Sequence, residues 1–164
     1  MKYYGKGSLT SALKILLNIL LAIGVGMFIY LSINVLSTND LNISLMRKGI
    51  IYTLFVIGSI SLMLIIFHLR KILDSLIYVN PFIRENVKRL RNIAVECFII
   101  TGCYLINFFI NPKYVDFNLI TIDMKGVHTD MEFFIFFFSG CFILVLSKVF
   151  QQAVEVKEEN DFTI

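Results

Sequence analysis

The amino-acid sequence predicts an all-α integral membrane protein with four transmembrane helices in a bundle. A cytoplasmic helical hairpin is expected to extend spans two and three. The chain is 57% hydrophobic and only 16% charged, whereas soluble proteins have about 25% charged residues. The apolar residues are gathered in four long runs, and most charges lie in the connections. The predicted spans are residues 13–36, 49–68, 92–110 and 131–150.

The lengths of the apolar runs support this prediction. The first three reach or approach the roughly 20 residues that a helix needs to cross the hydrocarbon core. The fourth, Phe133–Ser147, is shorter, but Met131 extends it and Lys148 can snorkel to the interface. The first run follows three lysines, as in a signal peptide. It is longer than a signal core and has no A-x-A-like cleavage site, which favours a retained anchor. We expect a single membrane domain over residues 1–164.

The distribution of basic residues predicts the topology. Most of the 15 Lys and Arg residues lie in the N-terminal segment, the middle connection and the C-terminal segment. Cytoplasmic segments carry such an excess of positive charge. We therefore expect a multi-pass protein of the bacterial cell membrane, with cytoplasmic N- and C-termini and anionic lipid at the cytoplasmic face.

The middle connection, residues 69–91, is predicted to form the cytoplasmic hairpin. Its first apolar residues recur at helical spacing, which indicates that the second helix continues beyond the membrane. Asn80 precedes Pro81, which disfavours helix at Asn80. Asn80 is then expected to cap a new helix with Pro81 at its first position. An apolar face and a basic face follow in that helix. The apolar residues are Phe82, Ile83, Val87 and Leu90, and the basic ones include Arg84, Lys88 and Arg91.

The C-terminal tail, residues 151–164, has the opposite charge to the hairpin. Both segments are expected on the same side of the membrane, so we expect the tail to dock on the hairpin or to share a binding face with it. The alternative is that the hairpin rests on anionic lipid, at roughly 1 kcal/mol per basic residue, while the tail is solvated. The candidate partner-binding residues are Arg84, Lys88, Arg89, Arg91, Glu158, Glu159, Asp161, Phe162 and Ile164.

Three motifs resemble a known family. They are Asn80-Pro81-Phe82, the run from Glu85 to Arg91, and the terminal run from Glu158 to Ile164. Together they are similar to the YoaS-like proteins, bacterial four-span membrane proteins of unknown function with a tail resembling E-E-N-D-L-T-I. Phe162 replaces the Leu of that tail. Members are often encoded beside a small helix-turn-helix regulator of the Cro/C1 type, so the resemblance implies a regulatory partner and no chemistry.

Among the polar residues inside the predicted spans or at their ends, the candidates for contacts within the membrane are Asn18, Glu96, Asn107 and Lys148. The asparagines are candidates for interhelical hydrogen bonds. Glu96 is expected to pair with Lys148 near the cytoplasmic boundary, where a charge costs less than the roughly 2.5–3.5 kcal/mol at the bilayer centre. A proton or cation relay is the less favoured alternative. Ala22 and Gly26 have the spacing that allows another helix, including that of a second copy, to approach closely.

The sequence contains none of the common catalytic or metal-binding motifs, such as H-E-x-x-H, G-x-S-x-G or a Gly-rich phosphate loop. The three cysteines have no C-x-x-C spacing, so a disulfide or metal framework is not expected. We therefore expect a non-enzymatic protein without a cofactor. The outer loop, residues 111–130, has alternating Val115, Phe117 and Leu119. It is expected to be a connector with some β structure, with a sensing surface for a peptide or cation as the alternative.

These observations predict a membrane regulator or sensor whose hairpin and tail hold or release a small helix-turn-helix partner. Direct binding of nucleic acid is not expected, because the chain has no DNA-binding module. The alternative is an immunity or transport-like protein that acts against a membrane-active peptide or on a small solute.

Overall fold

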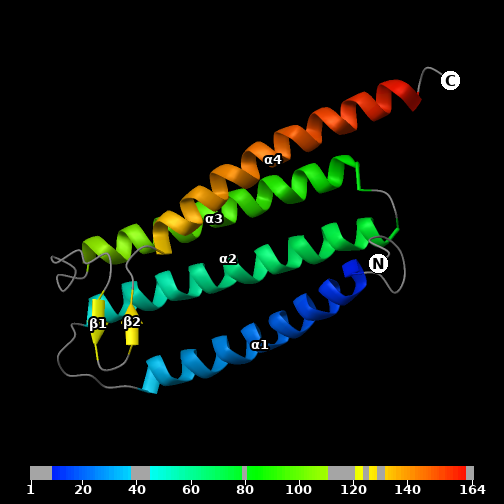
Figure 1. Cartoon of the computed structure of the whole chain (residues 1–164). Coiled ribbons are helices and arrows are strands. Elements are labelled where there is room, and N and C mark those ends of the chain that lie inside the picture. The colour runs from blue at the N-terminus through cyan, green and yellow to red at the C-terminus, as the bar shows by residue number, and fades with distance from the viewer. Residues whose placement is uncertain are drawn as a thin grey trace.

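The computed structural model describes residues 9–37, 45–78, 81–110, 121–123, 126–128 and 132–161. Long helices dominate these segments (Figure 1). A two-stranded antiparallel sheet pairs Thr121 with His128 within the outer loop. The elements are α1 Leu9–Ser37, α2 Leu45–Ile77, α3 Arg84–Ile110, β1 Thr121–Asp123, β2 Gly126–His128 and α4 Glu132–Asp161.

Each of the four described helices is long and apolar enough to cross a membrane. Large apolar side chains are also exposed along their outer faces, among them Ile15 (58%), Ile33 (60%) and Val145 (63%). Contiguous apolar surface of this extent would be unfavourable in water but suits contact with lipid. Length, composition and surface together indicate a multi-pass membrane protein.

The helices form an open row in chain order. Helix α1 packs on α2, α2 on α3, and α3 on α4. Within the described residues no other pair of helices is in contact. Figure 1 shows this row, with α1 and α4 at opposite edges of the bundle. Helix α3 therefore has neighbours on two sides, whereas α1 has only α2.

Most of the buried apolar residues among the described ones lie on α3, which packs on both α2 and α4. Buried positions on that helix alternate between spacings of four and three residues, which is the repeat of a coiled-coil seam. They include Asn86, Leu90, Ile93, Cys97 and Ile100. The buried residues of α4 recur at seven-residue spacing, and they are Gly140, Ser147 and Val154.

A close contact at Gly140 sets the separation of α3 and α4. A Cβ atom at this position would lie 3.0 Å from Cε1 of Phe98 and 3.2 Å from Cβ of Cys97. Small residues allow helix backbones in membranes to approach in this way. The larger side chains of α3 then pack beside the glycine.

The predicted start of the third helix is wrong by about one turn. Pro81 precedes the helix, which begins at Arg84, and Asn80 lies outside the described residues. The carbonyl oxygen of Pro81 accepts a hydrogen bond from the backbone N–H of Ile83 (3.2 Å). The carbonyl oxygen of Ile83 then accepts the N–H groups of Asn86 (3.0 Å) and Val87 (3.4 Å). The Pro81 carbonyl takes part in this turn, so the first helical hydrogen bond is accepted two residues later, by the carbonyl of Ile83.

The predicted continuation of the second helix is confirmed, since α2 runs without a break to Ile77. At 33 residues it is about 50 Å long, well beyond the roughly 30 Å of a hydrocarbon core. Between α3 and α4 in the chain, the two strands lie at residues 121–123 and 126–128. The alternating residues Val115, Phe117 and Leu119 lie outside the described residues.

Candidate functional site at the charged end

The turn between α2 and α3, the start of α1 and the end of α4 lie at one end of the bundle, which we call the charged end (Figure 1). The two strands lie at the other, which we call the strand end. At the charged end the Nζ atom of Lys14 on α1 lies 2.5 Å from a carboxylate oxygen of Asp74 on α2. A second ion pair joins α3 to α4. Ion pairs thus join neighbouring helices at this end of the bundle.

Arg84 and Glu158 form the second pair, although 74 positions separate them in the chain. The guanidinium Nε donates to Oε1 of Glu158 at 2.8 Å, and Nη2 donates to Oε2 at 2.5 Å. Such two-point contacts fix geometry as well as charge. The hydrogen bond from Arg84 lowers the pKa of the Glu158 carboxyl below its ordinary value. The same bond raises the pKa of Arg84.

Apolar and backbone contacts hold α4 against the start of α3 beside this pair. The rings of Phe82 and Phe150 lie 5.6 Å apart, centroid to centroid. The Ser147 hydroxyl donates to the backbone oxygen of Val87 at 3.1 Å. Val154 is 3% exposed. The part of the predicted tail from Gln151 to Asp161 is therefore a continuation of α4, and its Glu158 reaches the hairpin.

A hollow of about 230 Å³ lies between α3 and α4 next to this contact. The exposed side chains of Lys88 and Arg91 line it from α3, and Gln151 and Glu155 line it from α4. Of the described residues, neither Lys88 nor Arg91 forms an ion pair. The hollow can accept an acidic or hydrogen-bonding group. We call this hollow, with Arg84 and Glu158, the charged-end site.

Not all predicted site residues join it. The Arg89 guanidinium Nη1 faces α2, donating to Oδ1 of Asn86 at 2.9 Å and to the backbone oxygen of Lys71 at 3.3 Å. Glu159 and Asp161 are exposed at the end of α4. Phe162 and Ile164 lie outside the described residues. The structure therefore assembles part of the predicted set and gives Arg89 a role within the hairpin.

Sequence reasoning missed Asn86, which is completely buried. Its amide nitrogen donates to the Ser75 hydroxyl at 2.5 Å and to the backbone oxygen of Pro81 at 2.8 Å. Its amide oxygen accepts from Arg89. This one side chain ties α2, the turn and α3 together. A signal was present in the sequence, because Asn86 begins the apolar four-three repeat that continues through Leu90 and Ile93.

The expected ion pair between Glu96 and Lys148 is not formed. Ser147 is the residue of α4 that faces α3, at the level of Val87. Lys148 is exposed, because the next residue on a helix points about 100° away. Glu96 is half-buried and lies about 13 Å further along α3 than Val87. Both the rotation of α4 and its register therefore separate the two charges.

The two asparagines of the spans differ in their surroundings. Asn18 is exposed on α1. Asn107 is half-buried and faces a second hollow near the strand end. Metal-ligating side chains do not gather in any group of three or more within the described residues. The thiols of Cys97, Cys103 and Cys141 are free.

Comparison with known proteins places the chain in a family. The model of a family described as a protein of unknown function, DUF2975, matches residues 37–164. The chain belongs to DUF2975. The DUF2975 match covers α2, α3, α4 and both strands, and so includes the whole charged-end site. Neither a curated protein nor a solved structure matches the chain.

Proposed function

We propose that this protein is a non-enzymatic regulator or sensor of the bacterial cell membrane, and that its charged-end site holds a small soluble partner. The observation that carries the proposal is the docking of α4 on α3 through Arg84 and Glu158. This contact builds the site from two segments of the DUF2975 region that are 74 positions apart in the chain. The positive-inside rule supports a cytoplasmic location for it.

The chemistry of the hollow supports binding of a partner with acidic side chains. Lys88 and Arg91 present two exposed cations on one face of α3. Gln151 and Glu155 lie across from them, and the Gln151 amide donates a hydrogen bond to the Glu155 carboxylate at 3.0 Å. Complementary charge of this kind steers association and sets the register of a complex. The similarity to YoaS-like proteins supports a helix-turn-helix protein of the Cro/C1 type as the partner.

Co-purification from the native membrane tests this proposal. The tagged wild-type protein is expected to carry a small helix-turn-helix protein, identified by mass spectrometry. The double variant Lys88→Gln/Arg91→Gln should lose most of it. The matched control is Arg70→Gln/Lys71→Gln, which removes two positive charges from the same connection but leaves the hollow unchanged. Equal capture by both double variants would contradict the proposed site.

A second experiment distinguishes binding of a protein partner from binding of lipid. Wild type and the Lys88→Gln/Arg91→Gln variant are reconstituted into vesicles with and without anionic lipid, and the accessibility of the hollow to a charged reagent is compared. Protection that needs only anionic lipid would favour the simpler interpretation, in which the hairpin rests on the membrane surface. We expect protection to need the soluble partner.

A further inference from the structure

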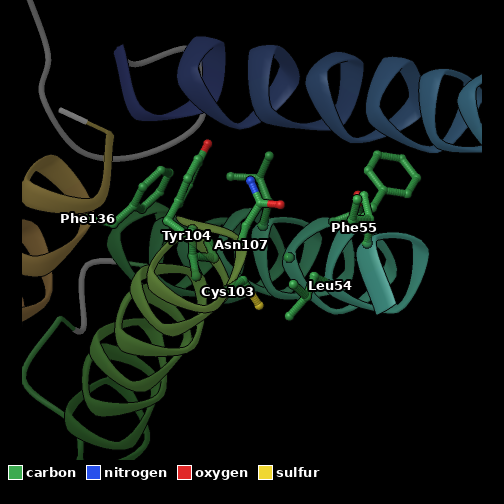
Figure 2. A pocket seen from close by; sticks show the side chains of 11 residues that line it. Leu54, Phe55, Cys103, Tyr104, Asn107 and Phe136 are labelled. Atoms are coloured by element: carbon green, nitrogen blue, oxygen red, sulfur yellow. The ribbon is translucent and has the colours of Figure 1, made fainter. Parts of the chain in front are cut away.

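The second hollow lies away from the charged-end site, in the half of the bundle near the strand end. It measures about 370 Å³ and is lined by α2, α3 and α4. Pockets of roughly 300–1,000 Å³ are the size that accommodates small molecules. Figure 2 shows Leu54 and Phe55 entering from α2, Cys103, Tyr104 and Asn107 from α3, and Phe136 from α4. We call it the strand-end pocket.

None of the described residues that line the strand-end pocket is charged. Most of its wall is apolar, and the aromatic ring of Phe136 stacks on that of Tyr104 at a centroid distance of 6.1 Å. A carboxylate or an ammonium ion would find no counter-charge there, and desolvating it would be unfavourable. The lining therefore selects an uncharged ligand.

The polarity of the lining also changes along the length of the pocket. Asn107 lies within one turn of Ile110, the last residue of α3. Ile100 lines the pocket about 10 Å deeper along the same helix, and Leu62 lines it at the corresponding depth on α2. The amide and the Tyr104 hydroxyl thus stand toward one end, while Leu62 and Ile100 lie at the other, with the hydroxyl of Ser59 one turn from Leu62. A ligand with one polar head and an apolar body matches this gradient.

Two polar groups in the pocket have unused hydrogen-bonding capacity. Among the described residues, neither the Asn107 amide nor the Tyr104 hydroxyl has a hydrogen-bond partner. An amide or hydroxyl that faces an apolar wall without a partner is less stable than one that is hydrogen-bonded. A ligand head group that pairs with them would recover this free energy. An aliphatic chain without a head group would leave them unpaired.

The pocket lies on the side of α2 and α3 that faces α1, since the ring of Phe55 stacks on that of Phe28 of α1 at a centroid distance of 5.8 Å. No residue of α1 lines the pocket, and in Figure 2 Tyr104, Asn107 and Phe55 project toward the side on which α1 runs. Tyr104 is 40% exposed. We propose that the strand-end pocket is a binding site for a small neutral amphiphile, with its hydroxyl or amide head on Asn107 and Tyr104 and its apolar body between α2 and α3.

The absence of tryptophan from the chain provides a direct test. A single tryptophan at Phe136 becomes a fluorescent reporter in the pocket wall, and Phe55→Trp is a second reporter on α2. Phe142→Trp is the matched control, because residue 142 is 68% exposed on α4 and does not line the pocket. Brominated octanol is titrated onto each protein in vesicles. We expect saturable quenching for both pocket reporters and only a linear decrease for the control.

Substitutions in the pocket then identify the ligand contacts. Gly58 lines the pocket, and nothing lies within 4 Å of a Cβ built there. Gly58→Leu should fill the space and abolish saturable quenching, whereas Gly26→Leu, at an equally open position on α1, should not. Asn107→Leu should weaken binding about fivefold through the lost hydrogen bond. Wild-type thermal unfolding with and without the alcohol supplies a measurement free of substitutions.

Each outcome decides between occupants. Saturable quenching that Gly58→Leu removes and Asn107→Leu weakens supports the proposal. If brominated phosphatidylcholine quenches the pocket reporters and octanol does not compete, the pocket holds an ordinary lipid chain and the proposal is overturned. Linear quenching for all three reporters also overturns it. Neither result depends on the charged-end site, so the two proposals can fail separately.

Discussion

At the scale of single residues, Asn86 is a fully buried polar side chain that depends on hydrogen bonds to three partners. It is 0% exposed, and its amide uses both nitrogen and oxygen in hydrogen bonds to Ser75, Pro81 and Arg89. A buried polar network of this kind stabilises only when every member has a partner. Removing the amide takes one donor each from the Pro81 carbonyl and the Ser75 hydroxyl, and it removes the side-chain acceptor of Arg89.

We therefore expect Asn86→Leu to lower the free energy of unfolding by about 2 kcal/mol, the typical penalty for a buried group left unpaired. Asn160→Leu is the control, because that asparagine is exposed on the same side of the bundle. Chemical unfolding in detergent micelles measures both. An equal, small effect for the two variants would show that the hydrogen bonds of Asn86 contribute little.

The Arg84–Glu158 pair predicts a dependence of stability on pH. The pKa of Glu158 is lowered in the folded protein by the hydrogen bond from Arg84. A lowered carboxyl pKa adds stability above the unfolded pKa, and this contribution is lost as the pH falls through the folded pKa. Wild type should thus be more stable than Glu158→Gln at neutral pH and no more stable in strong acid.

Thermal unfolding of both proteins across the acidic range measures this difference. The pair is exposed to solvent, so raising the salt concentration should also reduce the difference at neutral pH. Asp161→Asn, at an exposed position one turn further along α4, is the matched control and should show a smaller change with pH. A constant difference between wild type and Glu158→Gln at all pH values would contradict a role for the ionised carboxylate.

At the scale of the elements, the α3–α4 contact depends on Gly140. Substitution by valine places branched methyl groups against Cβ of Cys97 and the ring of Phe98, where a single Cβ already lies at 3.0–3.2 Å from them. We expect Gly140→Val to destabilise the protein by about 1–3 kcal/mol, as overpacking does. Gly102→Val is the control, since nothing lies within 4 Å of its Cβ.

Unfolding of the two valine variants under the same conditions measures the contact. Both replace glycine by a β-branched residue within a helix, so their intrinsic helix propensities change alike. The difference between them reports the packing against α3. If Gly102→Val is as unstable as Gly140→Val, the close approach of the two helices is not what limits the size of residue 140.

The helices themselves could be predicted from the sequence, because apolar runs and turn signals are local features. The continuation of α2 to Ile77 follows from its helical spacing. The rotation of α4 about its axis could not be predicted. Apolar residues lie all around this helix, so its sequence does not mark the face that packs on α3. This is why the pairing of Glu96 with Lys148 was wrong. The rotation of α4 follows from the contacts of Gly140 and Ser147 with α3, and these contacts are seen only in the packed structure.

The candidate sites show the same limit. Opposite charge in the hairpin and the tail predicts that they meet, and Arg84 and Glu158 do so. The sequence does not show that Arg89 turns toward α2, since that depends on the buried oxygen of Asn86. The strand-end pocket could not be predicted at all. Its lining comes from three helices, and each contributes residues that look like ordinary membrane-facing side chains.

At the scale of the whole molecule, the row of helices separates two regions of different chemistry. The charged end gathers ion pairs between neighbouring helices, and the strand end contains an uncharged pocket. Both lie mostly within α2, α3 and α4, the part matched by the family, while α1 packs along one edge. In the proposed orientation, the surface potential of the cytoplasmic leaflet acts on the charged end, and the proposed amphiphile binds at the strand end.

This polarity predicts the topology of the chain, and cysteine labelling can measure it. In a variant whose three native thiols are replaced, Tyr78→Cys and Asp161→Cys should react with an impermeant reagent only from the cytoplasmic side. Tyr78 is 77% exposed beside the α2–α3 turn, and Asp161 is exposed at the end of α4. Leu45→Cys, at an 87% exposed position where α2 begins, should react only from outside.

The physical reason is the excess of Lys and Arg in the segments at the charged end, because positively charged connections remain on the cytoplasmic side. Inside-out and right-side-out vesicles serve as reciprocal controls for each variant. Labelling of Tyr78→Cys and Asp161→Cys from opposite sides would contradict the structure, since the α2–α3 turn and the end of α4 lie at the same end (Figure 1). Labelling of both from outside would keep the structure but reverse the orientation, and the charged-end site could then not meet a cytoplasmic partner.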